Sequence, residues 1–558
     1  MILQADSVPI DSTLEADVCI VGGGAAGLSI ALKLCGSGLK VILLESGQFK
    51  FSSQTQRLYE GSVSSEALHS PLDKFRQRRF GGSTNIWGGR CAPLDPIDFQ
   101  KRAYIPDSGW PIGYEQLSGH YAEACLLAEA GKFEFSAGDA SNIDIRKLIE
   151  GFDASDINTD GLERFSCPTN FALRYQERLK AASNIEIYLG ANVTRIDLHT
   201  NGSHVKHLAV ATLGGNRFNV SAKAQILAMG GLENVRLLLS SHNVAPQGVG
   251  NDHDVVGRYY MSHIAGHVGN LTLNITPAAV HHGYAVSRDG IYIRRRIALT
   301  SVAQQRLGVT NMVARLHFPQ PSDPGHRNGV LSAIYLARRL ISFEYSRRLG
   351  DEGKKKDSLL WRHLRNVLSE FPDIAHFLSH WILQRKMKER KFPSVILRNK
   401  SNQFSLDIHA EQIPLRDSRI TLTRDADVLG MPKMHVDWKY DRLDIHSIEK
   451  SLDLIANAFA ASGTGLFEYD RNGLEHELTK YGAYGGHHLG TTRMGTDLAT
   501  SVVDSDCQVH GVDGLYIAGG SVFPTSSQAN PTLSIIAIGL RLAEHICNRA
   551  SVKSPIIG

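Results

Sequence analysis

The feature that most constrains the fold is a strand, glycine turn, helix and second strand at residues 17–45. Residues 17–21 (Asp-Val-Cys-Ile-Val), apolar after Asp17, are typical of a buried strand, and the turn Gly-Gly-Gly-Ala-Ala-Gly follows over residues 22–27. A helix to about residue 35 and an apolar strand over residues 40–45 complete the unit. A lone glycine triplet is weak evidence, but this order of elements is typical of the Rossmann-like fold that binds dinucleotides.

Three glycines and one carboxylate in this unit have separate expected roles. Gly22 makes the tight turn, Gly24 lets the backbone approach a pyrophosphate, and Gly27 lets the helix pack closely on the strand. The phosphates are expected at the helix N-terminus, where free amides and the helix dipole favour negative charge. Glu45 ends the second strand at the position that binds ribose hydroxyls, which favours an unphosphorylated adenosine ribose over the 2′-phosphate of NADP.

Length, charge and cysteine content narrow the class of protein. A chain of 558 residues with 42% apolar content can bury two packed domains. A net charge of +4 gives no reason to expect a nucleic-acid partner. The seven cysteines include no C-x-x-C pair, which argues against a zinc site, an iron–sulfur cluster or a c-type haem, and against a disulfide framework. We see no signal-peptide pattern before Asp17 and no run of 18 apolar residues, so we expect a cytoplasmic protein.

A second glycine-rich segment makes a family resemblance specific. Residues 81–89 read Gly-Gly-Ser-Thr-Asn-Ile-Trp-Gly-Gly, a composition that lets backbone lie flat against a planar ring. Together with the opening unit, His487 and Asn530, this segment resembles the glucose–methanol–choline (GMC) oxidoreductase family, which holds FAD and oxidises alcohols. Within the family the chain is similar to the branch of pyranose oxidase and bacterial sugar dehydrogenases, because Asn530 stands where other members carry a second histidine.

The resemblance implies the fold class and the domains. The class is α/β (α+β overall), with a Rossmann-like FAD-binding domain and an inserted substrate domain made of an antiparallel sheet and helices. We assign residues 1–105, 185–260 and 481–558 to the FAD-binding domain, and residues 106–184 and 261–480 to the substrate domain. Short alternating strands in the two insertions agree with this division.

The closing region carries the expected chemistry. Removing hydride from an alcohol requires a base for the hydroxyl proton, and histidine suits this because its usual pKa lies near neutrality. Alignment with the family makes His487 the base, and Asn530 then hydrogen-bonds the reacting oxygen. His488 is expected to be structural, because consecutive residues of an extended segment point to opposite sides. Asn530 also fits a helix N-cap, with Pro531 as the first helical residue.

FAD is expected to bind without a covalent link. Several family members tether FAD through a histidine in the second glycine-rich segment, and Ile86 occupies that position here. The resemblance places the backbone at Val193 against the adenine, and the helix after Asn530 is expected at the flavin pyrimidine. The residues expected to bind FAD are Gly22, Gly24, Ala26, Gly27, Glu45, Ser46, Gly82, Ser83, Asn85, Gly88, Gly89, Val193, Gly519, Gly520, Asn530 and Thr532.

A basic insertion at about residues 338–391 stands apart from the rest of the chain. It holds 14 Lys and Arg against 7 Asp and Glu. Two predicted helices, about 358–370 and 374–391, carry apolar residues at roughly helical spacing. Such a basic amphipathic pair can make a peripheral contact with an anionic membrane surface or with an acidic electron-accepting subunit. The alternative is a solvated hairpin that covers the active site.

The sequence as a whole predicts an FAD-dependent oxidoreductase that takes hydride from a CH–OH group of a sugar, glycoside or polyol to flavin N5. The electron acceptor is expected to be oxygen, a quinone or a redox protein. Sugar follows from the branch resemblance and not from identified sugar-binding residues. Three alternatives stay open: a dehydrogenase of a non-sugar alcohol, a flavin-bearing lyase without net redox change, and a non-catalytic flavoprotein subunit of a membrane complex.

Overall fold

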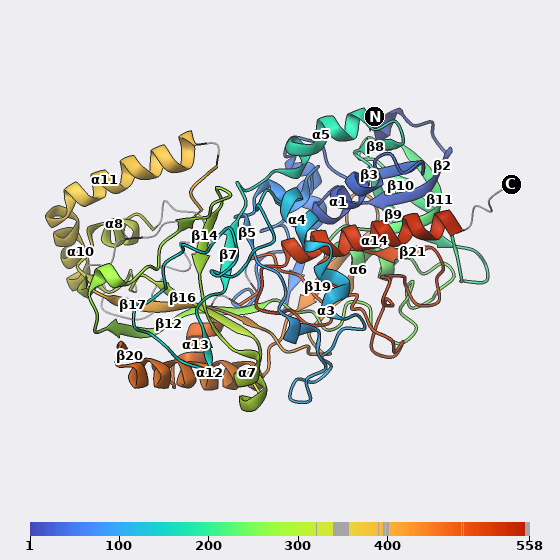
Figure 1. Cartoon of the computed structure of the whole chain (residues 1–558). Coiled ribbons are helices and arrows are strands. Elements are labelled where there is room, and N and C mark those ends of the chain that lie inside the picture. Colours follow the sequence, from blue (N-terminus) through green and yellow to red (C-terminus); the bar gives the residue numbers. More distant parts are fainter. Residues whose placement is uncertain are drawn as a thin grey trace.

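A mainly parallel sheet and a separate antiparallel sheet organise the chain and lie side by side (Figure 1). One hydrophobic core runs through both, from Ile20 in the first sheet to Phe404 in the second. This arrangement confirms the predicted class, α/β and α+β overall. No helix among the described residues is both long and apolar enough to cross a bilayer. The computed structural model describes residues 1–319, 321–338, 357–388, 390–393, 397, 401–480, 482–483 and 485–552.

The first sheet contains the predicted Rossmann-like unit. Its strands follow the order β1-β8-β3-β2-β11-β10-β9, and β21 also pairs with β11. Val18 lies in register with Val41 on one side and with Ala224 on the other. All the strands come from the three segments assigned to the FAD-binding domain, whose exact boundaries stay a prediction. The strands are β1 (Ile2–Gln4), β2 (Thr13–Val21), β3 (Val41–Glu45), β8 (Ile185–Leu189), β9 (Asn192–Leu198), β10 (Val205–Ala211), β11 (Arg217–Leu227) and β21 (Leu515–Ile517).

Helix α1 (Ala25–Leu34) packs directly on this sheet. Gly22 has a φ of +108°, and a Cβ on Gly27 would lie 1.9 Å from the carbonyl oxygen of Gly22. A side chain at position 27 would therefore push the helix away from the strand. Helix α14 (Thr532–Val552) runs beside α1 (Figure 1), and a Cβ on Gly539 would lie 3.2 Å from a carbonyl oxygen of α1. The glycine turn is thus held between the sheet and the C-terminal helix.

The second sheet is antiparallel and brings two histidines together. Its order is β20-β12-β17-β16-β15-β6, with α12 packed on β20 and α13 on β12. His263 is in register with Glu411, and Ala265 with His409. His263 and His409 are therefore diagonal neighbours on one face of the sheet. The elements are β6 (Ile157–Asn158), β12 (His263–Leu273), β15 (Ile297–Leu299), β16 (Met312–His317), β17 (Gln403–Glu411), β20 (Gly465–Glu468), α12 (Arg442–Ser462) and α13 (Leu474–Thr479).

Two smaller sheets complete the fold, with orders β13-β14-β7-β5 and β18-β19-β4. β5 directly follows the second glycine-rich segment. This segment therefore connects the glycine turn beside the first sheet to the small sheet that contains β5. The strands are β4 (Gly61–Val63), β5 (Arg90–Cys91), β7 (Leu162–Phe165), β13 (Ala285–Val286), β14 (Tyr292–Arg295), β18 (Arg419–Ala426) and β19 (Pro432–Asp437). The further helices are α2 (Ser53–Gln56), α3 (Tyr114–Ser118), α4 (Tyr121–Leu127), α5 (Phe171–Ala181), α6 (Glu233–Ser240), α7 (Ser301–Leu307) and α8 (Gly329–Leu336).

The described part of the basic insertion forms two helices that pack on α8. α10 spans Asp357–Ser369, close to the prediction, and α11 spans Phe371–Ile382 before a short π-helical turn. The predicted second helix, 374–391, is wrong at both ends. Pro372 lies in the first turn of α11, where a missing N–H removes no helical hydrogen bond. Residues 339–356 of the insertion lie outside the described residues.

Candidate functional site

A pocket lies where the two glycine-rich segments meet. The amide of Gly81 donates to the carbonyl of Gly23 over 2.8 Å. A Cβ on Gly82 would lie only 2.9 Å from the Cα of Gly24. The close approach therefore depends on glycine in both segments. Of the predicted site residues, the pocket wall contains Gly22, Gly24, Ala26, Glu45, Ser46, Gly82, Ser83, Val193, His487, Gly519, Gly520 and Thr532.

The start of α1 fits the phosphates of a dinucleotide. A Cβ added to Gly24 would meet no atom within 4 Å, so the backbone here faces open space. Gly24 is the N-cap, and its lack of a side chain leaves the first helical amides for an anion. The buried carboxylate of Glu45 accepts the amides of Gly23 over 2.8 Å and Gly47 over 2.7 Å. Its Oε2 atom keeps a lone pair that can accept a ribose hydroxyl.

Asn85 braces the second glycine-rich segment. Its Nδ2 donates to the carbonyls of Phe80 and Gly82 over 3.0 and 2.7 Å, and its Oδ1 accepts from Asn170 over 2.8 Å. These bonds hold the loop in place, and Asn85 itself does not line the pocket. The FAD contact predicted for Asn85 stays a prediction, as it does for four more residues outside the wall: Gly27, Gly88, Gly89 and Asn530.

Sequence reasoning missed a buried ion-pair cluster in the pocket wall. Arg76 and Arg78 both bind the carboxylate of Glu233, with N–O distances of 3.0 and 2.9 Å. Burial by itself raises the pKa of Glu233, but the two guanidinium groups lower it to about 2. Arg76 also lies over the ring of Tyr59, 3.7 Å from its centroid. The run Arg-Gln-Arg-Arg at residues 76–79, one residue before the second glycine-rich segment, was the signal that could have revealed this cluster.

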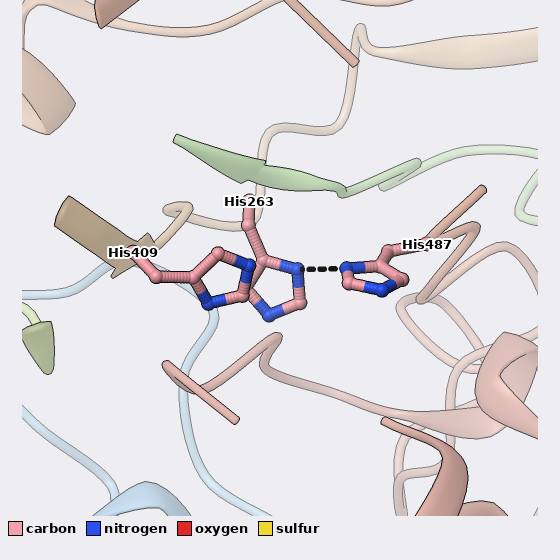
Figure 2. Close-up of side chains that lie close together, drawn as sticks. All are labelled: His263, His409 and His487. Atoms are coloured by element: carbon pink, nitrogen blue, oxygen red, sulfur yellow. Dashed lines mark hydrogen bonds between the residues drawn. The ribbon is translucent and has the colours of Figure 1, made fainter. Parts of the chain in front are cut away.

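Backbone pairing brings three histidines to one place (Figure 2). Met261 and Leu489 form an antiparallel pair with two hydrogen bonds of 2.9 and 3.0 Å. His263, two residues after Met261, faces His487, two residues before Leu489, and their Nδ1 atoms lie 3.0 Å apart. His409 comes from β17 and stacks on His263 with the ring centroids 4.1 Å apart.

The hydrogen bonds of this cluster define where its protons lie. The Nδ2 of Asn530 lies 3.4 Å from the Nε2 of His487 and can only donate, so Nε2 accepts. A neutral His487 then carries its proton on Nδ1 and donates it to the Nδ1 of His263. His263 in turn carries its proton on Nε2. His409 donates from Nδ1 to the carbonyl of Gln528 over 2.6 Å.

The surroundings favour the neutral form of all three rings. Burial, and then the charge of Arg90, lower the pKa of His487 to about 4. Burial and the neighbouring His487 lower the pKa of His409 to about 3. Burial also lowers the pKa of His263 well below its usual value. A neutral His487 has a lone pair on Nε2, so it can accept a proton from a hydroxyl at neutral pH.

The three histidines also offer the nitrogen ligands that a divalent metal uses. Two ligands on a tetrahedral zinc, with Zn–N distances of about 2.0–2.1 Å, lie about 3.3 Å apart. The 3.0 Å between the Nδ1 atoms of His263 and His487 is shorter and has the length of a hydrogen bond. The geometry therefore favours a proton over a metal ion between these two rings.

Asn530 does not occupy the helix position that the sequence predicted. α14 begins at Thr532, and the amide of Ile535 donates to the carbonyl of Pro531 over 2.8 Å. Pro531 is therefore the N-cap and Asn530 precedes it, outside the helix. The predicted N-cap role of Asn530 is wrong, because its amide turns toward His487 and not back to the first helical amides.

The side chains of His488 and His487 have different neighbours. The centroid of its ring lies 6.3 Å from that of His69 and 6.0 Å from that of Tyr260. His487 faces His263 instead. This divergence is what an extended segment produces at consecutive positions, while the structural role of His488 stays a prediction.

Two family profiles match the chain. The profile described as "FAD dependent oxidoreductase" covers residues 17–333, more than half of the chain. The profile described as "GMC oxidoreductase" covers residues 414–539. The chain therefore belongs to the FAD-dependent GMC oxidoreductases, enzymes that act on CH–OH donors.

Individual relatives match nearly the whole chain. The 2-methyl-1,2-propanediol dehydrogenase of Mycolicibacterium austroafricanum is 23% identical, with 96% of each chain covered. The fructose dehydrogenase large subunit of Gluconobacter japonicus is 22% identical over 96% of this chain and 99% of the relative. The solved structure of a fungal aryl-alcohol oxidase has a TM-score of 0.53 at 14% identity, covering 98% of this chain and all of the other. This last likeness shows the fold alone.

The proton positions predict different results for two replacements of His263. His263→Leu removes the acceptor of the His487 Nδ1 proton and should slow flavin reduction about tenfold to a hundredfold, part of the roughly 10²–10⁴ that a general base contributes. His263→Asn keeps an acceptor oxygen near the Nδ1 position and should retain most of the rate. Stopped-flow reduction over a pH series measures both. The acid limb of the pH–rate profile is the range in which the rate falls because His487 becomes protonated. In the Leu variant this limb should move to lower pH, because the loss of a hydrogen-bond partner for protonated His487 lowers its pKa.

His409→Leu is the control for this comparison. His409 bonds to Gln528, so its replacement removes a buried ring without removing the acceptor of His487. We expect a smaller loss of rate and no shift of the acid limb. Equal rates for the Leu and Asn variants of His263 would contradict the deduced proton positions.

Proposed function

We propose that this enzyme oxidises a CH–OH group of a sugar, glycoside or polyol, with His487 as the general base. The observation that carries the proposal is the pairing of His487 with Asn530, 3.4 Å apart, beside a pocket built from two glycine-rich segments. An imidazole lone pair and an amide donor at one point can hold an alcohol oxygen from two sides. When bound, FAD supplies the hydride acceptor at N5.

The two side chains divide the work on the substrate hydroxyl. The substrate hydroxyl replaces the contact between Asn530 and His487 that is present without substrate. The Nε2 of His487 then takes the hydroxyl proton, while Asn530 donates an amide hydrogen to the same oxygen and stabilises the negative charge that develops there. His487 then carries a positive charge. Its Nδ1–H bond to His263 holds the ring in place during this change.

The sugar class of substrate rests on the branch resemblance and on the relative named fructose dehydrogenase. The relative named for 2-methyl-1,2-propanediol makes a non-sugar alcohol the second candidate. A flavin-bearing lyase is a further candidate, because it uses a base and an amide donor on a hydroxyl group in the same way. A non-catalytic flavoprotein subunit is a weaker candidate, because it gives no reason for these two groups at one point. The electron acceptor is proposed to be oxygen, a quinone or a redox protein. The seven free cysteines support a reducing compartment such as the cytoplasm.

We expect FAD to leave the protein intact on acid precipitation. Ile86, at the tethering position, is 48% exposed and has no nucleophilic atom. The supernatant should therefore contain all the flavin, with the mass of free FAD. Flavin that stays with the precipitated polypeptide would mean that another residue forms a covalent link.

His487→Ala should lower the rate of flavin reduction by about 10² to 10⁴, the usual contribution of a general base, and leave FAD bound. His488→Ala should cost much less. Because the pKa of His487 is lowered to about 4, the wild-type rate should be constant at neutral pH and fall only in acid, where the base becomes protonated. Stopped-flow flavin reduction, with samples matched for FAD content, measures the rates of the two variants and the pH dependence of the wild-type rate. A larger loss in the His488 variant would exchange the roles of the two histidines.

An anaerobic screen tests the proposed reaction directly. Sugars, glycosides and polyols should bleach the visible absorption of the flavin, and the product should contain a new carbonyl group. Simple diols and benzyl alcohol serve as the comparison set. Faster bleaching by the comparison set would move the assignment to the non-sugar candidate, and no bleaching by any alcohol would leave only the lyase or the non-catalytic subunit.

A further inference from the structure

The outer side of the helical hairpin formed by α10 and α11 is apolar, and no described part of the chain covers it. It lies at the end of the molecule opposite α14 (Figure 1). Nine large apolar side chains of this region are between 41% and 73% exposed. We call this set the hairpin surface: Leu360, Trp361, Leu364, Leu368, Phe371, Leu378, Ile382, Leu383 and Met387.

The hairpin surface is additional to the face by which these helices are already held. Ile374 and Phe377 pack with Leu331 in a small core below the hairpin. His363 is buried on the same inner side, with its Nδ1 3.0 Å from the hydroxyl of Ser332. The folding of the hairpin therefore does not use the outer residues. Helices that are apolar on more than one face normally have the second face covered as well.

The outer residues of α10 form one continuous stripe. Leu360, Leu364 and Leu368 follow one another at a spacing of four, and Trp361 lies beside them. Phe371 continues the exposed set into α11. Monomeric proteins rarely leave an apolar patch of this extent open unless it binds something.

Basic side chains border this surface. Arg362, Arg365, Lys388 and Lys391 are exposed. Glu370, in contrast, accepts an amide of α8 over 2.8 Å and is directed inward. The described residues of the basic insertion hold eight Lys and Arg against three Asp and Glu, in a chain whose net charge is only +4. Positive charge is thus concentrated at the same end of the molecule as the exposed apolar side chains.

We propose that the hairpin surface docks on an anionic lipid bilayer as a peripheral contact. Trp, Phe and Leu side chains beside Arg and Lys enter the boundary between headgroups and acyl chains, where the basic groups also meet anionic headgroups. A fluid surface accepts side chains that protrude from two helices without a preformed complementary groove. None of the nine residues lines the pocket, so docking and flavin chemistry use separate parts of the protein.

Co-sedimentation of the full-length, FAD-loaded protein with vesicles tests this contact. The protein should bind vesicles of phosphatidylcholine with phosphatidylglycerol, bind phosphatidylcholine alone less tightly, and dissociate as salt is raised. The double variant Trp361→Gln/Leu368→Gln should bind about tenfold more weakly or worse. The matched control is Leu126→Gln/Leu173→Gln, two residues exposed by 66% and 62% on α4 and α5, which should bind like wild type.

A second variant separates charge from apolar contact. Arg362→Glu/Arg365→Glu should remove the preference for anionic vesicles, while both hairpin variants should keep the wild-type rate of flavin reduction with a soluble substrate. Wild-type protein that stays in the supernatant with anionic vesicles would overturn the proposal. So would equal binding by the apolar variant and its control. Lipid-free self-association that the apolar variant abolishes would assign the surface to a second copy of the chain and overturn it too.

Discussion

The geometry of the site depends on one antiparallel backbone pair, that of Met261 with Leu489. The pair joins the start of β12 to the segment that carries His487, and it sets two histidines 224 residues apart in sequence opposite one another. Gly490 makes the approach possible, because its φ is +79° and a Cβ there would lie 2.5 Å from the carbonyl oxygen of Tyr259. The position of the proposed base is therefore fixed by backbone hydrogen bonds and one glycine, before any side chain is considered.

Local motifs explain which parts of the site were predictable from the sequence. The strand, the glycine turn and the acidic residue at 45 act over a few residues, so their pattern predicts both α1 and the buried carboxylate of Glu45. His263 and His409 carry no such signal, since each is one polar residue in an ordinary alternating strand. Their meeting follows from strand register, which a single sequence does not reveal. The start of α14 was predicted one residue too early for a similar reason. Asn530 followed by Pro531 is locally a favoured start of a helix, but the side chain of Asn530 contacts His487, 43 residues away in sequence, and this contact is not visible in the local pattern.

The low pKa of His487 has a consequence for the proposed reaction. A base with a pKa of about 4 is present in its neutral form at neutral pH, but it is far weaker than an alkoxide. Full removal of the hydroxyl proton before the hydride leaves would therefore be steeply uphill. Proton transfer that accompanies hydride departure avoids a free alkoxide. Negative charge developing on the substrate oxygen also raises the pKa of the adjacent His487, and Asn530 shares that charge through its amide.

The two ends of the molecule meet different physical demands. The nucleotide end needs close backbone contact, so glycines and buried ion pairs hold its pocket and leave little room for substitution. The hairpin end needs only a small inner core, which frees the outer faces of α10 and α11 from any role in folding. Large apolar side chains on a face that folding does not use lower solubility unless a partner covers them. A contact made at that end changes where the enzyme resides while leaving the proton positions around His487 as the backbone sets them.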